Sequence, residues 1–260
     1  MYKILKYSFF DLMRSRWTYI YCAFYFIFSI SLLVLSNDLS KVVISLMNII
    51  LLLCPLIATM FGIMYFYNSR EFTELLLAQP IKRAHIFLGQ YLGLAGSLSL
   101  SLLLGVGLPF VFYGIFGSAE IWNFFTLLVV GVLLSFIFSA IAFFIALKNE
   151  NRIKGFGLAI VAWLFFAVVY DGIFLLSLVL FNDYPLENFA LGASLFNPID
   201  LSRILILLKL DISALMGYTG AVFNKFLGTG FGMLTSLLAL LLWIVVPFFG
   251  IQFVATRKDF

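Results

Sequence analysis

Side chains that could ligate a metal ion or drive catalysis are scarce in this chain. It contains one histidine, His85, and two cysteines, Cys22 and Cys54, which do not form a CxxC pair. Haem ligation by paired histidines, histidine-based metalloprotease sites and di-iron sites each need several such ligands. The sequence also lacks the GxxxxGK run that cradles nucleotide phosphates. It therefore predicts no catalytic residue, no metal site and no cofactor in this chain, and any ATP and Mg²⁺ would be bound by a partner.

One carboxylate is notable for its surroundings. Asp171 lies inside a long apolar stretch, where a charge at the centre of a membrane helix costs on the order of 3 kcal/mol. Such a group either faces a watery vestibule or bonds a partner, for example a hydroxyl on a neighbouring helix. The sequence leaves its structural and functional roles open and marks Asp171 as the intramembrane polar candidate.

A charged island at residues 68–83, NSREFTELLLAQPIKR, separates two long apolar runs. Glu71 and Glu74 are spaced one helical turn apart, three leucines at 75–77 form an apolar side, and Pro80 ends the segment. A solvated loop does not account for three successive leucines, which need a surface to bury against. We therefore predict a short amphipathic helix that transmits force from a soluble partner to the flanking spans.

These residues must be positioned by membrane-spanning helices. The chain has 260 residues, of which 64% are hydrophobic and 11% charged, and its mean hydropathy is +1.14, a balance typical of an integral membrane protein. Its apolar runs are continuous, unlike the alternating segments of a β-barrel. Six of them have the roughly 20 residues that a spanning helix needs. They cover residues 17–35, 42–67, 86–113, 121–147, 156–181 and 230–256.

The distribution of Lys and Arg predicts the orientation of these spans. Twelve of the sixteen basic residues fall on one side of the predicted membrane, and that side is the cytoplasmic one by the positive-inside rule. We therefore expect a multi-pass protein of the bacterial inner membrane with both termini in the cytoplasm, and no nucleic-acid partner. The cytoplasmic group is Lys3, Lys6, Arg14, Arg16, Arg70, Lys82, Arg83, Lys148, Arg152, Lys154, Arg257 and Lys258.

Two further segments complete the expected architecture. Residues 1–16 have a basic and an apolar face, which fits a helix lying in the headgroup region, although an ordinary flank of the first span explains them equally well. In the third span, Gly89, Gly93 and Gly96 would let another helix approach closely.

The last outer segment, residues 182–229, is the longest stretch outside the spans. Asn197 followed by Pro198 is an N-cap with proline at N1. Leucines and isoleucines then recur at helical spacing, so we expect amphipathic helices over 198–216 that lie on the outer face. Asp211 is a candidate cap for the second of them. The glycine-punctuated residues 217–229 favour a loop that re-enters the interface, and no seventh span is predicted.

The charged island resembles the coupling-helix motif of the ABC-2 (type V) exporter permeases. The matching positions are Arg70, Glu71, Glu74, Leu75, Leu76, Pro80 and Arg83, followed by Gly89. The resemblance extends over the whole chain, because these permeases also have an interfacial N-terminal helix and six spans. It implies a single transmembrane domain over 1–260 that pairs with a second copy of itself and with two cytoplasmic ATPase subunits. It also implies a transporter subunit and not an enzyme.

The outer segment is similar to one subgroup of that family, the permeases that serve maturation of nitrous oxide reductase. That resemblance implies an outer β-helical periplasmic partner, assembly of copper centres in a periplasmic enzyme, and at most an indirect relation to a copper chaperone. No cluster of Cu(I) ligands supports copper binding by this chain, since Met216 and Met233 are isolated. The residues implied in partner docking are Asn197, Pro198, Asp200, Arg203, Asp211, Gly217 and Tyr218.

Three alternatives share parts of this pattern. A generic exporter of a drug, lipid or peptide would have the same coupling features. An intramembrane enzyme would need a constellation that one histidine and Asp171 do not supply. A purely structural membrane scaffold would bind no ATPase.

Overall fold

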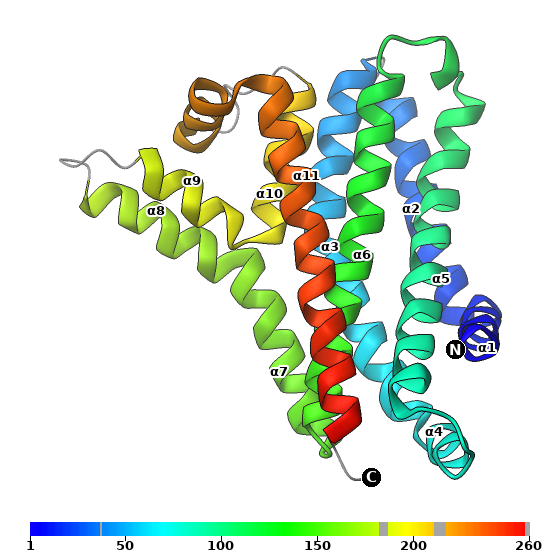
Figure 1. Ribbon diagram of the computed structural model, residues 1–260. Helices are drawn as coiled ribbons and strands as arrows, with labels where there is room; N and C mark the ends of the chain where they lie inside the picture. Colours follow the sequence, from blue (N-terminus) through cyan, green and yellow to red (C-terminus); the bar gives the residue numbers. More distant parts are fainter. Residues whose placement is uncertain (37, 182–186, 211–216, 258–260) are drawn as a thin grey trace.

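Long apolar runs fold as helices in this chain, because a helix satisfies every backbone N–H and C=O within its own segment. The computed structural model describes all residues except 37, 182–186, 211–216 and 258–260. For residues 187–188 and 217–229 it describes the backbone but not the side chains. Every element in the described part is a helix (Figure 1). The elements are α1 (Tyr2–Met13), α2 (Arg16–Leu35), α3 (Leu39–Asn68), α4 (Arg70–Leu77), α5 (Arg83–Phe112), η1 (Ile115–Gly117), α6 (Ile121–Lys148), α7 (Arg152–Leu164), η2 (Phe165–Val169), α8 (Tyr170–Leu180), α9 (Glu187–Leu195), α10 (Pro198–Lys209) and α11 (Gly217–Arg257).

Six segments of the described part are long and apolar enough to cross a membrane, which confirms the predicted fold class. They are α2, α3, α5, α6, the combined α7–η2–α8 and the later part of α11. The pair α9–α10 is bent by 110° at its junction and would make a seventh crossing only if the two helices were counted as one broken span. The fifth span is itself interrupted, because the π-helical turn η2 separates α7 from α8.

The core lies among α3, α5 and α6. Helix α3 packs along α6, α2 and α1 pack against α5, and α10 and α11 close the other side of α6. Large side chains that are fully buried fill the centre, including Ile50 and Phe138, and Phe110 stacks on Phe124 with ring centroids 4.2 Å apart. Helix α7 packs against α3 and α6, whereas α8 leans away from the bundle (Figure 1) and has no buried residue.

Helix α1 packs closely against the glycines of α5, in agreement with the prediction that these glycines let another helix approach. A methyl group at Gly93 would lie 2.7 Å from the Cβ of Ser8 and 2.9 Å from the carbonyl oxygen of Leu5. At Gly89 the nearest atoms are those of Ile4, 3.1 Å away. The N-terminal helix is therefore docked on α5 and is not a loose flank of the first span.

Substitution Gly93→Leu is expected to displace α1. The larger side chain overpacks a contact that has no room for a methyl group, which typically costs about 2 kcal/mol. The measurement is the apparent melting temperature of the purified protein, with Gly107→Leu as control because nothing lies within 4 Å of the Gly107 position. Equal melting temperatures for the two variants would contradict the tight α1–α5 contact.

The structure corrects the prediction for residues 198–229 in two places. Helix α10 does not lie on the outer face, because it is buried against α11, α6 and α3. Its isoleucines and leucines cover more than one side, which is the pattern of an enclosed helix. The loop predicted for 217–229 is also wrong, since the backbone is helical from Gly217 onward. Glycine is common in membrane helices and does not end this one.

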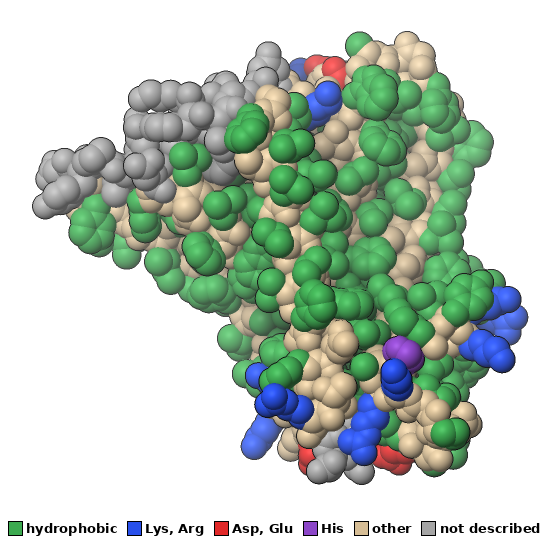
Figure 2. All heavy atoms as spheres, viewed as in Figure 1, with side chains coloured by type: hydrophobic (Ala, Val, Ile, Leu, Met, Phe, Trp, Pro, Cys, Tyr) green, Lys and Arg blue, Asp and Glu red, His purple; other side chains and the backbone are tan. Residues whose placement is uncertain are grey.

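The two ends of the bundle differ in charge. Helix α4 and the C-terminal end of α11 lie at the same end (Figure 1). Lys and Arg side chains gather at this end and on α1, whereas the flank of the bundle between the ends is mostly hydrophobic (Figure 2). We refer below to the basic end of the bundle, which carries α4, as the α4 end.

Candidate functional site

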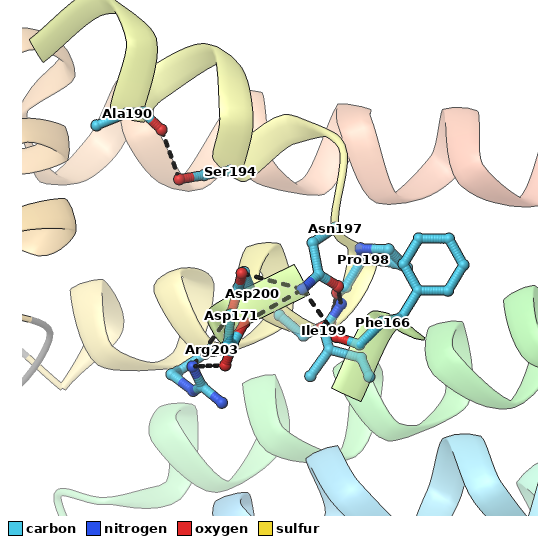
Figure 3. A network of polar contacts seen from close by, with 10 residues as sticks. Phe166, Asp171, Ala190, Ser194, Asn197, Pro198, Ile199, Asp200 and Arg203 are labelled. Carbon is cyan, nitrogen blue, oxygen red and sulfur yellow. Dashed lines mark hydrogen bonds and ion pairs between the residues drawn. The ribbon is translucent and has the colours of Figure 1, made fainter. Parts of the chain in front are cut away.

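A polar network lies at the junction of α8 and α10, away from the α4 end (Figure 3). Asn197 is fully buried and caps α10, its side-chain oxygen accepting from the backbone N–H of Ile199 at 3.0 Å. Its amide nitrogen donates to the carbonyl oxygen of Phe166 and to Oδ2 of Asp200, both at 3.0 Å. Phe166 lies in the π-helical turn η2, a type of turn that is frequent at functional sites. The amide thus joins the break in the fifth span to the start of α10.

Arg203 completes this network by bridging two carboxylates. Its Nη1 lies 3.1 Å from Oδ1 of Asp200 and 3.3 Å from Oδ2 of Asp171. The side chain of Asp200 is 14% exposed and that of Asp171 29%. Asp171 therefore bonds a partner on another helix, and that partner is a guanidinium, not the hydroxyl given as an example above. One guanidinium bridges two carboxyl groups and ties α8 to α10.

The structure restricts how the predicted docking residues can be used. Asn197 and Pro198 are buried within this chain, so a partner could reach them only after α10 moves. Asp211 lies outside the described residues, and for Gly217 and Tyr218 only the helical backbone of α11 is described. Their role in docking stays a prediction.

Helix α4 projects beyond the spans at the basic end of the bundle (Figure 1). It is shorter than the predicted 68–83 and ends at Leu77, because Pro80 disfavours helical geometry in the residue before it. Arg70, Glu71, Glu74, Leu75 and Leu76 lie on α4, whereas Pro80 is in the connection and Arg83 begins α5. The predicted coupling residues therefore lie on α4, in the connection that follows it and at the first residue of α5.

Helix α4 carries both an exposed leucine and an exposed ion pair, and the ion pair borders the cleft behind the helix. The side chain of Leu75 is 68% exposed. Arg70 Nε pairs with Glu74 Oε1 at 3.0 Å, and both side chains are largely in water. An exposed pair of this kind contributes at most about 1 kcal/mol, so its two partners can rearrange at little cost when another protein binds.

The inward face of α4 is fixed to the rest of the bundle. Thr73 is buried, donates to the carbonyl oxygen of Ser69 at 2.8 Å and accepts from Nε2 of Gln90 at 2.9 Å. Phe72 stacks on Tyr7 of α1 with ring centroids 4.7 Å apart. A cleft of about 570 Å³ remains between α4 and the ends of α3, α5 and α6, with Arg70, Glu74 and Arg83 among its lining residues. Movement of α4 must therefore act on α1 and α5.

Comparison with known families decides the class of protein. The model of the ABC-2 family transporter protein matches residues 2–259. The chain belongs to the ABC-2 transporter family. An ABC-2 permease is the membrane subunit of a transporter and works with an ATPase, so it is not itself an enzyme.

A curated relative of this ABC-2 permease is the probable ABC transporter permease protein NosY of Stutzerimonas stutzeri. The two chains are 29% identical over 136 residues. The matched stretch covers 50% of this chain and 49% of the relative, so it spans about half the length of that protein.

One residue of the ABC-2 permease was missed by the reasoning from sequence. Gln90 is fully buried and contacts α4 directly through Thr73. A signal was available, because Gln90 is the single side-chain amide in the apolar run of the third span. Its partner on α4 could not be identified without the structure, since the two residues belong to different helices.

Proposed function

We propose that this permease transmits movement from a cytoplasmic ATPase at α4 to the bent α9–α10 pair, which lies away from the α4 end. The observation that carries the proposal is the construction of α4, which exposes Leu75 outward and is held inward by the Thr73–Gln90 hydrogen bond. The basic residues at the α4 end support a cytoplasmic location for that end. Both termini would then face the cytoplasm of a bacterial inner-membrane protein.

A continuous series of packed helices connects the two ends. Helix α5 is bonded to α4 through Gln90. It also contacts α6, because the hydroxyl of Tyr91 on α5 donates to the carbonyl oxygen of Phe136 on α6 at 3.2 Å. Helix α6 packs directly against α10, which carries Asp200 and Arg203. Because tightly packed helices shift as units, displacement of α4 would change the position of α10.

The substitution Gln90→Leu tests this connection. The ATPase should still bind, because the outward face of α4 is unchanged, but stimulation of its activity by the permease should fall about tenfold, within the range of ordinary coupling energies. The measurement is ATP hydrolysis by the reconstituted complex together with the amount of ATPase recovered. Gln252→Leu is the matched control, since Gln252 is exposed on α11. Full stimulation in Gln90→Leu would exclude transmission through this hydrogen bond.

For the biological role, we propose the maturation of the copper centres of nitrous oxide reductase. The support is the 29% identity to NosY over about half of each chain and the resemblance of the outer segment, residues 182–229, described above. The proposed assembly contains two copies of this permease, two ATPase subunits and a β-helical periplasmic protein. The proposal assigns no copper ligand to this chain, and a copper chaperone would act on the periplasmic partner.

Purification of the tagged permease from native membranes, followed by mass spectrometry, tests this role. A periplasmic β-helical protein recovered with the ATPase would support it. Recovery of the ATPase with no periplasmic protein would favour the alternative, a generic exporter of a drug, lipid or peptide. Release of the periplasmic protein by Arg203→Leu, with the ATPase retained, would place its docking surface near α10.

A further inference from the structure

A second groove lies at the α4 end on the side of α1, distinct from the cleft behind α4. It has a volume of about 550 Å³ and is formed by α1, α2, α3 and α4. Its lining is divided between polar groups, which include Arg14, Ser15 and Ser69, and a wall of aromatic rings. The coupling proposed above uses none of these side chains except through the contact of Phe72 with Tyr7.

Two helices begin at this groove, and neither start is capped by a side chain. Helix α2 begins at Arg16, and its N-cap residue Ser15 makes no side-chain capping bond. Helix α4 begins at Arg70, and the hydroxyl of its N-cap residue Ser69 donates to the carbonyl oxygen of Phe66 instead. The first backbone N–H groups of a helix need acceptors, and they carry a partial positive charge. Two such starts at one groove favour an anion.

The side chains around these helix starts add positive charge and an unused hydroxyl. Arg14 is exposed and lines the groove, and it forms no ion pair with the residues that the structure describes. Tyr65 also lines the groove and is only 7% exposed, yet its buried hydroxyl has no hydrogen bond of normal geometry within the described part. Asp11 also lines the groove and offsets the charge of Arg14. The excess positive charge comes from Lys3, Lys6 and Arg16, which are exposed on the same segment of chain but do not line the groove. The segment that carries the groove, residues 1–16, therefore has a net positive charge.

The aromatic wall and the position of the groove indicate the kind of anion. Trp17, Phe61 and Phe72 line it, and tryptophan and tyrosine are enriched where a protein meets the membrane–water interface. Helix α1 lies against the flank of α5, between the middle of the spans and the projecting α4 (Figure 1). Basic side chains accompany hydrophobic ones on this part of the surface (Figure 2). A ligand with a phosphate and an apolar body matches both the polar part of the groove and its aromatic wall.

We propose that this groove binds an anionic phospholipid. The phosphodiester lies at Arg14 and the starts of α2 and α4, and the acyl chains run along Trp17 and Phe61 toward the bilayer. The bound lipid touches α1, α2 and α4 together, so it steadies the helix on which the ATPase acts. Zwitterionic lipids fit less well, because their choline or ethanolamine group adds a positive charge to a basic surface.

Native mass spectrometry of the delipidated complex with its ATPase tests the proposal. The complex is titrated with phosphatidylglycerol or with phosphatidylcholine, and the retained lipid is counted. Loss of a charge-assisted hydrogen bond should weaken phosphatidylglycerol binding about tenfold in Arg14→Gln. Met64→Trp, which fills the groove without removing a charge, should give a similar loss. Lys154→Gln is the control, because Lys154 is an exposed cation at the start of α7 and outside the groove.

Each outcome is decisive. Preferential retention of phosphatidylglycerol by the wild type and by Lys154→Gln, with loss in both groove variants, supports the site. Equal retention of the two lipids by the wild type overturns it, as does unchanged binding in both groove variants. Displacement of phosphatidylglycerol by excess inorganic phosphate would show a simple anion site and would overturn the lipid assignment.

Discussion

Arg203→Leu is expected to lower the free energy of unfolding by roughly 2 kcal/mol. The substitution leaves Asp171 and Asp200 close to each other without the guanidinium that lies within 3.3 Å of both. Breaking a fully buried ion pair costs about 3–5 kcal/mol, and the value is smaller here because the side chain of Arg203 is 39% exposed. The measurement is the apparent melting temperature of the purified permease, together with protease sensitivity at the α8–α10 junction.

A compensated variant separates this electrostatic effect from lost packing. When Asp171→Asn and Asp200→Asn are combined with Arg203→Leu, no carboxylate remains unpaired and most of the stability should return. Arg203→Lys should fall between the wild type and Arg203→Leu, because it keeps the positive charge but its shorter side chain is less able to place one nitrogen, as Nη1 does, against both carboxyl groups. If the triple variant were no more stable than Arg203→Leu, the network would not be held by charge neutralisation.

The sequence predicted the parts of the fold that depend on local pattern. Span length and hydropathy identify the six crossings, because the bilayer sets both. The charged island at 68–83 predicted a helix at α4, and the glycines of α5 predicted a close neighbour. These properties are determined within one segment of chain, so no knowledge of tertiary contacts was required.

The errors occurred where two segments determine the outcome together. Helix α10 was expected on the outer face as an amphipathic helix, whereas its charged residues Asp200 and Arg203 are satisfied by each other and by Asp171. Once the charges are paired, the apolar remainder of the helix can be buried. The interruption of the fifth span at η2 was not predicted either, since a carbonyl oxygen in that turn is bonded by Asn197, which lies at the start of a different helix.

Leu75→Glu is expected to weaken binding of the ATPase about thirtyfold. An apolar side chain that is 68% exposed on a projecting helix is a suitable anchor for a pocket on a partner, and removal of such an anchor commonly costs about 2 kcal/mol. Glutamate adds the cost of burying a charge. Affinity is measured between the purified permease and its ATPase, and the melting temperature of the permease alone should not change, since Leu75 is not part of the core.

Ile153→Glu is the matched control for this experiment. Ile153 is also an exposed apolar residue at the α4 end, but it lies in the first turn of α7, where a carboxylate is favourable to the helix dipole. Normal binding in Ile153→Glu with loss in Leu75→Glu would localise the ATPase contact to α4. Equal loss in both would indicate a contact spread over the whole α4 end, and the coupling function would then not reside in α4 alone. The distinction matters for Gln90, because its hydrogen bond can transmit movement only if the force enters through α4.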